Sequence, residues 1–203
     1  ALPFQLPESH KIRRYGFHGT SHRYLASRFP CSRKLITLHL GNGCSAAAIR
    51  DGHSIDTTMG MTPLEGLVMG TRPGDLDPGI LLRLLQSGDF YPASLDTLLN
   101  RQSGLLGLSG VSNDMRELEA HAALGHPRAS LAIDVFCHRI RRAIGSLFAV
   151  LNGADTLVFS GGIGENSPHI RQLVCHNLDA LGFSLDPALN HKTRAAEARI
   201  SPP

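Results

Sequence analysis

Apolar residues follow two different patterns along the chain, and each pattern predicts a different kind of element. A spacing of three or four residues predicts an amphipathic helix over 127–152, with Pro127 suited to its first turn and Gly153 to the position after its end. Its apolar stripe consists of Ile133, Phe136, Ile140, Ile144, Leu147 and Leu151. Shorter helices are expected over 20–29, 78–86, 95–100, 113–123 and 167–181.

Short apolar runs separated by turn dipeptides predict strands. Asn42-Gly43 lies between two such runs, and it predicts a type I′ hairpin turn, which needs positive φ at both central residues. Asp51-Gly52 predicts a second turn of the same kind, so three consecutive strands should be antiparallel. The expected buried strands are 34–40, 44–50 and 156–159, and a further strand is expected over 54–58.

Three stretches show neither the helical spacing nor the short apolar runs that predict strands. Residues 1–14 are polar and contain proline, and we expect them to be extended. Residues 105–111 are rich in glycine and are expected to be irregular. The stretch 60–78 is a long loop rich in glycine and proline, and loops of this length are usually functional. With helices before and after the strands, the whole pattern predicts an α/β fold built on a β-meander with flanking helices.

Composition narrows the class of protein. The chain has 203 residues, 42% hydrophobic and 18% charged, which excludes a disordered chain and suits one large domain or two small ones. Twenty basic residues against seventeen acidic ones suit small anionic ligands, and the basic residues are too scattered to predict nucleic-acid binding. No run of eighteen apolar residues occurs, so no membrane span or membrane partner is expected.

Cysteine usage and the chain ends add two expectations. The four cysteines are far apart and form no CxxC pair, which favours reduced thiols and a cytoplasmic location over a zinc ribbon or a disulfide framework. The sequence begins at Ala1 without an initiator methionine or a signal-peptide pattern, and it stops at 200–203, where a strand might begin. We therefore expect it to be part of a longer chain.

Two glycine-rich turns are candidate ligand sites. Gly161–Asn166 lies between a predicted strand and a predicted helix, where backbone N–H groups and the helix start favour anions. It lacks the register of a dinucleotide fingerprint and the lysine of a Walker A loop. His39–Gly43 forms the tip of the first hairpin, and its amides could cradle phosphates. The alternatives are a tight strand-to-helix turn and a plain hairpin.

Basic side chains near other glycines are further candidates. Arg72 lies in the long loop, and its planar guanidinium suits carboxylate or phosphate, although a salt bridge to Asp75 or Asp77 is an alternative. His18 and His22 are spaced like zinc ligands on a helix, but no acidic partner stands beside them, so a histidine donating to an anion is favoured over a metal site.

A polar run at the start of a predicted helix is a weaker candidate. Ser112 or Asn113 can cap the helix, and Asp114 could also meet a ligand hydroxyl.

Five motifs together resemble the acetate kinase family. They are YGFHGTSH at 15–22, HLGNG at 39–43, GTRPGDLDPG at 70–79, SNDMREL at 112–118 and SGGIGENS at 160–167. They occur in the family's order and span nearly the whole chain. The resemblance implies the fold shared by actin, the sugar kinases and the heat-shock ATPases, which is ribonuclease H-like. It also implies transfer of a phosphoryl group from ATP to acetate with Mg²⁺, giving acetyl phosphate and ADP, in a cytoplasmic homodimer.

The resemblance also implies roles for matching residues. His18 and Arg72 match the two residues that stabilise the transition state, a role that suits phosphoryl transfer because it depends on positive groups and donors around the migrating group. The phosphate-binding turn would consist of His39, Leu40, Gly41, Asn42 and Gly43. Further nucleotide contacts would come from Asp114, Met115, Arg116, Gly161, Gly162, Ile163, Gly164, Glu165 and Asn166.

The same comparison predicts what this sequence does not carry. Full members of the family have an N-terminal phosphate loop, an upstream arginine and aspartate, and a C-terminal glutamate that helps to hold Mg²⁺. None of these is matched here, so we expect no metal ligand in this chain and no activity from the chain alone. Residues 1–30 are interpreted as an interdomain segment with the first helix, and 31–203 as the C-terminal nucleotide-binding domain.

Two alternative functions stay open. Another short-chain carboxylate kinase, such as a propionate kinase, would share these motifs. A nucleotide-binding module without catalysis would need the glycine-rich turns only, although the presence of both His18 and Arg72 argues against it.

Overall fold

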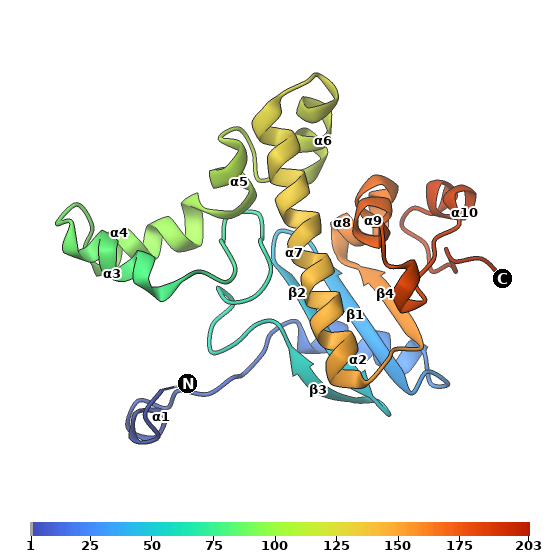
Figure 1. The fold of residues 1–203 in the computed structure, drawn as a ribbon, viewed down its shortest axis with the longest axis horizontal. Helices are drawn as coiled ribbons and strands as arrows, with labels where there is room; N and C mark the ends of the chain where they lie inside the picture. Colours follow the sequence, from blue (N-terminus) through green and yellow to red (C-terminus); the bar gives the residue numbers. More distant parts are fainter. Residues whose placement is uncertain (1) are drawn as a thin grey trace.

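A four-stranded sheet lies at the centre of the computed structural model, which describes residues 2–203 (Figure 1). The strands are β1 (Lys34–Leu40), β2 (Cys44–Arg50), β3 (His53–Thr57) and β4 (Thr156–Ser160), in the spatial order β3-β2-β1-β4. The three consecutive strands are antiparallel as predicted, and β4 pairs with β1 in parallel. The prediction that 156–159 is buried is wrong, because β4 is an edge strand whose first four residues are only partly buried.

The two hairpin turns differ. Asp51 and Gly52 have φ angles of 49° and 80°, which agrees with the predicted type I′ turn. Neither Asn42 nor Gly43 has a positive φ, so a type I′ turn is wrong for the first hairpin. The last residue pair of that hairpin is Leu40 with Cys44, which leaves a connection of three residues rather than two. This longer connection is closed by the Gly41 N–H, which donates to the Gly43 carbonyl over 3.1 Å.

Helices cover both faces of the sheet. The 25-residue helix α7 (Pro127–Leu151) lies across one face, where it packs on the even-numbered residues of β1 (Figure 1). Helix α2 (Gly19–Arg28) lies on the opposite face, where Leu35 of β1 forms a smaller apolar cluster. Because side chains alternate along a strand, Thr37 and His39 also face α2. The α7 stripe is buried as the periodicity predicts, and the helix ends at Asn152 in the left-handed conformation.

Two stretches contain helices that were not predicted, one in the segment expected to be extended and one in the segment expected to be irregular. Residues 5–9 form α1 (Gln5–Ser9), and Ala1 of the predicted extended segment lies outside the described residues. The glycine-rich stretch forms α5 (Gly104–Ser109), whose Leu105 is fully buried in the core with residues of α7. Tertiary packing therefore outweighs the low helix propensity of glycine.

The remaining helices follow the predictions with shifted ends. They are α3 (Pro78–Gln86), α4 (Pro92–Thr97) with a π-helical turn (Leu98–Gln102), α6 (Met115–Ala123) and α9 (Pro168–Cys175). A further helix, α10 (Pro187–Lys192), follows them. The helix predicted to reach residue 181 ends at Cys175, because Asn177 has a positive φ of 61°, and a 3₁₀ turn follows at Asp179–Leu181. Helix α10 was not predicted, and residues 200–203 form no strand.

The glycine-rich run after β4 is itself a helix, α8 (Gly161–Asn166), and not only a break before the next one. Gly161 has a φ of 77°, so the strand turns directly into the helix at this residue. A Cβ on Gly161 would lie 2.6 Å from the Leu40 carbonyl oxygen, which only glycine allows. Helix α8 therefore begins against the end of β1.

Helices α3 and α4 form an arm that projects from the rest of the molecule (Figure 1). Helix α3 has no buried residue, and the apolar Ile80, Leu82 and Leu85 are exposed. No helix within residues 2–203 is both long and apolar enough to cross a membrane. The expected domain boundary at residue 30 stays a prediction.

Candidate functional site

Two nitrogen atoms meet at the tip of the first hairpin, where Gly43 has no side chain. A Cβ built on Gly43 would lie 2.7 Å from Arg72 Nη2 and 3.2 Å from His18 Nε2. His18 comes from the start of α2 and Arg72 from the long loop, so the fold brings together three sequence-predicted residues from separate motifs. The absence of a side chain lets two hydrogen-bond donors, of the kind that binds an anion, approach the hairpin backbone at this position.

His18 is held in an unusual backbone conformation. It precedes α2 with a φ of 58°, a left-handed conformation that costs a non-glycine residue about 1–2 kcal/mol. Its ring stacks on that of His39, with centroids 4.2 Å apart, and its Nδ1 lies 2.8 Å from Ser45 Oγ. Such strained residues cluster at functional sites because the surrounding contacts must hold them in place.

Both histidines of α2 are neutral at pH 7. Burial, together with the nearby His39 and Arg72, lowers the pKa of His18 to about 4. Burial also lowers the pKa of His22 to about 4, with His18 and His39 adding to the effect. The pKa of His39 is lowered by burial, against which Glu165 acts. His18 thus meets a ligand as a neutral imidazole, and Arg72 supplies the positive charge.

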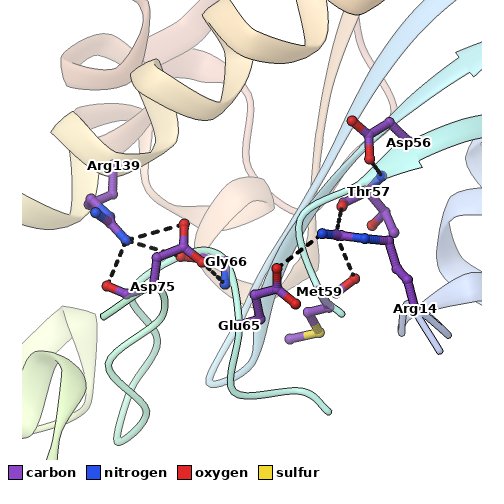
Figure 2. A network of polar contacts seen from close by, with 8 residues as sticks. All are labelled: Arg14, Asp56, Thr57, Met59, Glu65, Gly66, Asp75 and Arg139. Atoms are coloured by element: carbon purple, nitrogen blue, oxygen red, sulfur yellow. Dashed lines mark hydrogen bonds and ion pairs between the residues drawn. The ribbon is translucent and has the colours of Figure 1, made fainter. Parts of the chain in front are cut away.

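The long loop that carries Arg72 is fixed at both ends by arginines (Figure 2). Arg14 donates to the Thr57 carbonyl over 2.8 Å and pairs with Glu65 over 3.0 Å. On the other side, Arg139 of α7 donates to the Asp75 carbonyl over 3.0 Å, and the Asp75 carboxylate accepts from the Gly66 N–H over 2.7 Å. These contacts hold the loop, which has no secondary structure, in a fixed position and thereby fix the backbone that carries Arg72.

Arg72 is not paired with a carboxylate, which corrects the salt-bridge alternative. Asp75 serves Gly66 and Arg139, and Asp77 caps α3 by accepting from the Gly79 N–H. Arg72 Nη1 instead donates to the Pro63 carbonyl over 2.7 Å. This single contact holds one edge of the guanidinium and leaves Nη2 directed to the hairpin.

The hairpin tip is also tied to the segment before α6. Asn42 Oδ1 accepts from Asn113 Nδ2 over 3.0 Å, and the Asn42 carbonyl accepts from the Gly70 N–H over 2.9 Å. Three motifs that are far apart in sequence, at 39–43, 70–72 and 112–116, therefore lie side by side.

The cap of α6 is Asp114, which corrects the expectation that Ser112 or Asn113 caps this helix. Asp114 Oδ1 accepts from the Arg116 N–H over 2.9 Å, and the carboxylate also pairs with the Arg116 guanidinium, which lowers the pKa of Asp114. The Met115 side chain is buried in the core. Of the three nucleotide-contacting residues predicted at this motif, Asp114 and Arg116 are therefore the two whose side chains reach the surface.

The α8 motif lies beside the end of β1, next to the hairpin tip. Glu165 Oε1 accepts from the Gly161 N–H over 3.1 Å, and Asn166 Nδ2 donates to the Gly162 carbonyl over 2.9 Å. A Cβ on Gly162 would meet nothing within 4 Å, so this glycine faces open space. Of the two other members of the motif, Ile163 packs against the core and Gly164 is buried.

Sequence reasoning missed Ser45 and Thr37, and it considered His22 for a different role, as one of two histidines with the spacing of zinc ligands. Ser45 and Thr37 are fully buried on the α2 side of the sheet, where both contact His22. The signal available was a hydroxyl at positions of two strands that otherwise read as apolar. No group of three or more metal-ligating side chains occurs among the described residues.

Comparison with known proteins agrees with this geometry. The sequence pattern of the acetokinase family matches residues 1–203. The chain is 52% identical to the acetate kinase of Chloroherpeton thalassium over 211 aligned positions, which cover 100% of this chain and 51% of that protein. The structure superposes on Porphyromonas gingivalis acetate kinase with a TM-score of 0.96 at 44% identity, over all of this chain and 53% of that one.

A propionate kinase from Francisella tularensis is also similar, with a TM-score of 0.89 and 46% identity over 94% of this chain and 50% of the other. The chain thus belongs to the acetokinase family, and its predicted α/β fold is that of acetate kinases. It spans about half the length of the curated relatives it matches.

Proposed function

From the chain's place in the acetokinase family, we propose that the complete protein carrying it transfers a phosphoryl group reversibly between ATP and acetate, with acetyl phosphate and ADP as products. The observation that carries the proposal is the convergence of His18 Nε2 and Arg72 Nη2 on Gly43 at the tip of a glycine-rich hairpin. A purely structural role would explain neither the strained backbone of His18 nor an arginine without a carboxylate partner.

The two side chains suit the electrostatics of phosphoryl transfer. In this reaction, negative charge spreads over the three equatorial oxygens of the migrating group, and catalysis depends on positioning and on fixed donors. Arg72 supplies a permanent charge, and its other edge is fixed by the Pro63 carbonyl. Neutral His18 supplies a directed N–H without the cost of burying a second cation beside Arg72.

The nucleotide is proposed to lie along the hairpin, α6 and α8. The open space at Gly162 lets a ribose or base approach the backbone, and the hairpin glycines let phosphates approach theirs. Asp114 and Arg116 lie at the start of α6, where one carboxylate and one guanidinium offer contacts to ligand hydroxyls and phosphates. The side-chain bond between Asn42 and Asn113 keeps these segments in register.

Mg²⁺ is implied by the family but does not fit the residues present. The described part of the chain holds no group of three or more His, Cys, Asp or Glu side chains placed as ligands. We therefore assign no metal-binding role to residues of this chain. The proposed metal ligands belong to segments of the complete protein that lie outside these 203 residues.

The acceptor carboxylate distinguishes two candidate functions. The similarity to a propionate kinase at 46% identity favours a short-chain carboxylate one carbon longer as the second candidate. The test is acyl phosphate formation by the complete protein with ATP and Mg²⁺ on acetate, propionate and butyrate, with each acyl phosphate trapped by hydroxylamine. The highest kcat/KM on acetate is expected. A preference for propionate would favour the second candidate, and ATP binding without turnover on any of the three would favour a non-catalytic nucleotide-binding protein.

A homodimer is proposed for the complete protein. Ile80, Leu82 and Leu85 present an apolar face on the projecting helix α3, and such a face favours a protein contact. Light scattering of the complete protein should give twice the monomer mass. Leu82→Glu should weaken the association, while the same change at exposed Leu124, which lies outside the α3–α4 arm, should leave it intact.

A further inference from the structure

A buried line of four polar side chains leads away from His18. His18 Nδ1 lies 2.8 Å from Ser45 Oγ, Ser45 Oγ lies 2.8 Å from His22 Nε2, and His22 Nδ1 lies 2.8 Å from Thr37 Oγ1. His22, Thr37 and Ser45 are at most 5% exposed, so water does not compete for these contacts. We call these four residues the hydroxyl–imidazole chain.

The hydroxyl–imidazole chain results from the alternation of side chains between the two faces of the sheet. Thr37 of β1 and Ser45 of β2 point to the face of the sheet that α2 covers, and His18 and His22 lie four residues apart at the start of α2. One turn of helix and one pair of antiparallel strands therefore place two imidazoles and two hydroxyls in an alternating row.

Each buried polar group in the hydroxyl–imidazole chain needs a hydrogen-bond partner, and this requirement fixes the direction in which the hydroxyl and imidazole protons point. Thr37 Oγ1 is fully buried, and within the described residues its hydrogen-bonding partner is His22 Nδ1. A buried hydroxyl proton left without an acceptor is costly, so Thr37 donates to His22 Nδ1. Neutral His22 then carries its proton on Nε2 and donates to Ser45 Oγ, because a neutral imidazole has one donor and one acceptor.

Ser45 has one proton and two imidazole neighbours. Because it accepts from His22, it must donate its own proton to His18 Nδ1. His18 Nδ1 is then an acceptor, and the proton of the neutral ring resides on Nε2, which is the nitrogen that faces Gly43 and Arg72. All four donors point the same way, from the core toward the candidate site.

We propose that Thr37, His22 and Ser45 are positioning residues that hold the proton of His18 on Nε2, so that this ring donates to the migrating phosphoryl group. The effect on phosphoryl transfer rests on the proposed function. The assignment of the His18 tautomer rests only on the geometry of the four side chains. With the opposite tautomer, His18 would present a lone pair to an anion and repel it. An inverted tautomer of a catalytic histidine costs about 10⁴-fold in turnover in other enzymes.

The first test reads the tautomer directly. In the complete protein labelled with ¹⁵N-histidine, two-bond ¹H–¹⁵N correlation distinguishes a protonated ring nitrogen from a bare one, and the signal missing in His18→Gln identifies His18. Wild type is expected to show the proton on Nε2. Thr37→Val keeps the shape but removes the first donor, and it should give a mixture of both tautomers at His18. Thr37→Ser keeps the hydroxyl and should restore the wild-type signal.

The second test reads turnover on the same proteins. Thr37→Val should lower kcat by about tenfold or more, as part of the cost of an inverted tautomer, with KM for ATP within about twofold of wild type. Thr37→Ser should recover most of kcat. The matched control is Thr156→Val, which removes a hydroxyl bonded to Ser32 Oγ over 3.0 Å at the far end of the same sheet and should change neither readout.

Distinct outcomes separate this inference from the proposed function. If wild type forms no acyl phosphate from any short-chain carboxylate, the function is wrong, while the tautomer measurement still tests the hydroxyl–imidazole chain. A His18 proton on Nδ1 in wild type, or an unchanged tautomer in Thr37→Val, would overturn the inference, and so would an equal loss of kcat in Thr156→Val. If Thr37→Val does not fold, Ser45→Ala breaks the same chain next to His18 and is read in the same way.

Discussion

Gly43 and Arg72 lie so close that the position has no room for a side chain, since a Cβ on Gly43 would be 2.7 Å from Arg72 Nη2. Gly43→Ala should therefore displace the guanidinium, whose other edge is held by the Pro63 carbonyl, without breaking the backbone. Turnover of the complete protein should fall by about tenfold to 10²-fold, which is less than the loss of about 10²–10³-fold for a transition-state donor that is removed outright.

The matched control for this change is Gly145→Ala on α7. A Cβ there meets nothing within 4 Å, and alanine is favoured over glycine inside a helix by about 1 kcal/mol. Gly145→Ala should raise the melting temperature slightly and leave kcat unchanged. Full activity of Gly43→Ala would show that the position of Arg72 Nη2 beside Gly43 is not needed for turnover.

Arg72 should be irreplaceable by lysine. Arg72→Ala should lower kcat by about 10²-fold or more, because a fixed charge is lost at the migrating group. Arg72→Lys should recover little, since one ammonium cannot bond the Pro63 carbonyl and also reach the space beside Gly43. Steady-state kinetics measure both variants, and Arg33→Lys, at an exposed pair with Asp51, is the control. If lysine restored kcat to near the wild-type value, contact with the Pro63 carbonyl and placement beside Gly43 by one guanidinium would not be required.

The neighbouring glycines Gly161 and Gly162 should respond differently to valine. Gly162 faces open space, so Gly162→Val should fold normally, and any loss of ATP affinity by calorimetry would report a ligand close to this backbone. We expect a loss of about tenfold or more, which is about 1.4 kcal/mol of binding free energy. Gly161 has a φ of 77° and lies against the Leu40 carbonyl, so Gly161→Val should lower stability itself. Unchanged ATP affinity in Gly162→Val would remove α8 from the proposed nucleotide site.

The 203-residue chain by itself should not form acetyl phosphate. The transfer needs the acceptor carboxylate and the phosphoryl group held in line with the metal. The described residues supply His18, Arg72 and the hairpin but no cluster of metal ligands. Hydroxylamine trapping with ATP, Mg²⁺ and acetate should give no signal above background, and mixing with a separately produced remainder of the protein should restore it. Turnover by the chain alone at ordinary enzyme rates, about 10 s⁻¹, would contradict the prediction.

Periodicity was sufficient to predict the elements that bury one clear face. The α7 stripe follows from a spacing of three to four residues, the strands β1 to β3 follow from apolar runs separated by turn dipeptides, and the Asp51-Gly52 turn follows from the positive φ that it requires. Two of the failures share another cause. Helices α5 and α8 are rich in glycine, and each forms because tertiary contacts, with α7 and with the end of β1, outweigh local propensity.

The site was predictable only where a motif carried it. His18, Arg72 and Gly43 lie in recognisable motifs, but their convergence depends on the conformation of a loop held by Arg14 and Arg139 from other elements. Ser45 and Thr37 could not be singled out, because a hydroxyl in a buried strand is usually bonded to backbone. Only the register of β1 with β2 and the placement of α2 show that both hydroxyls bond imidazoles.

Protonation of the α2 histidines should weaken the fold in mildly acidic solution. Burial lowers the pKa of His22 to about 4 in the folded protein, and an unfolded histidine has a pKa of about 6.5. The unfolded state therefore binds protons first, so the stability that neutral His22 contributes is present above about pH 6.5 and is lost as the pH falls toward 4.

His22→Gln separates this effect from that of the other groups nearby. Glutamine does not titrate, yet it can accept from Thr37 and donate to Ser45, while His18, His39 and Arg72 remain in both proteins. Hydrogen exchange of β1 and β2 amides, compared at each pH, should show wild type losing protection relative to His22→Gln between about pH 6.5 and 4. His53→Gln at an exposed position of β3 should behave as wild type does. Parallel pH profiles of wild type and His22→Gln would mean that the pKa of His22 is the same in the folded and unfolded states, and this would contradict the burial of a neutral imidazole beside Ser45.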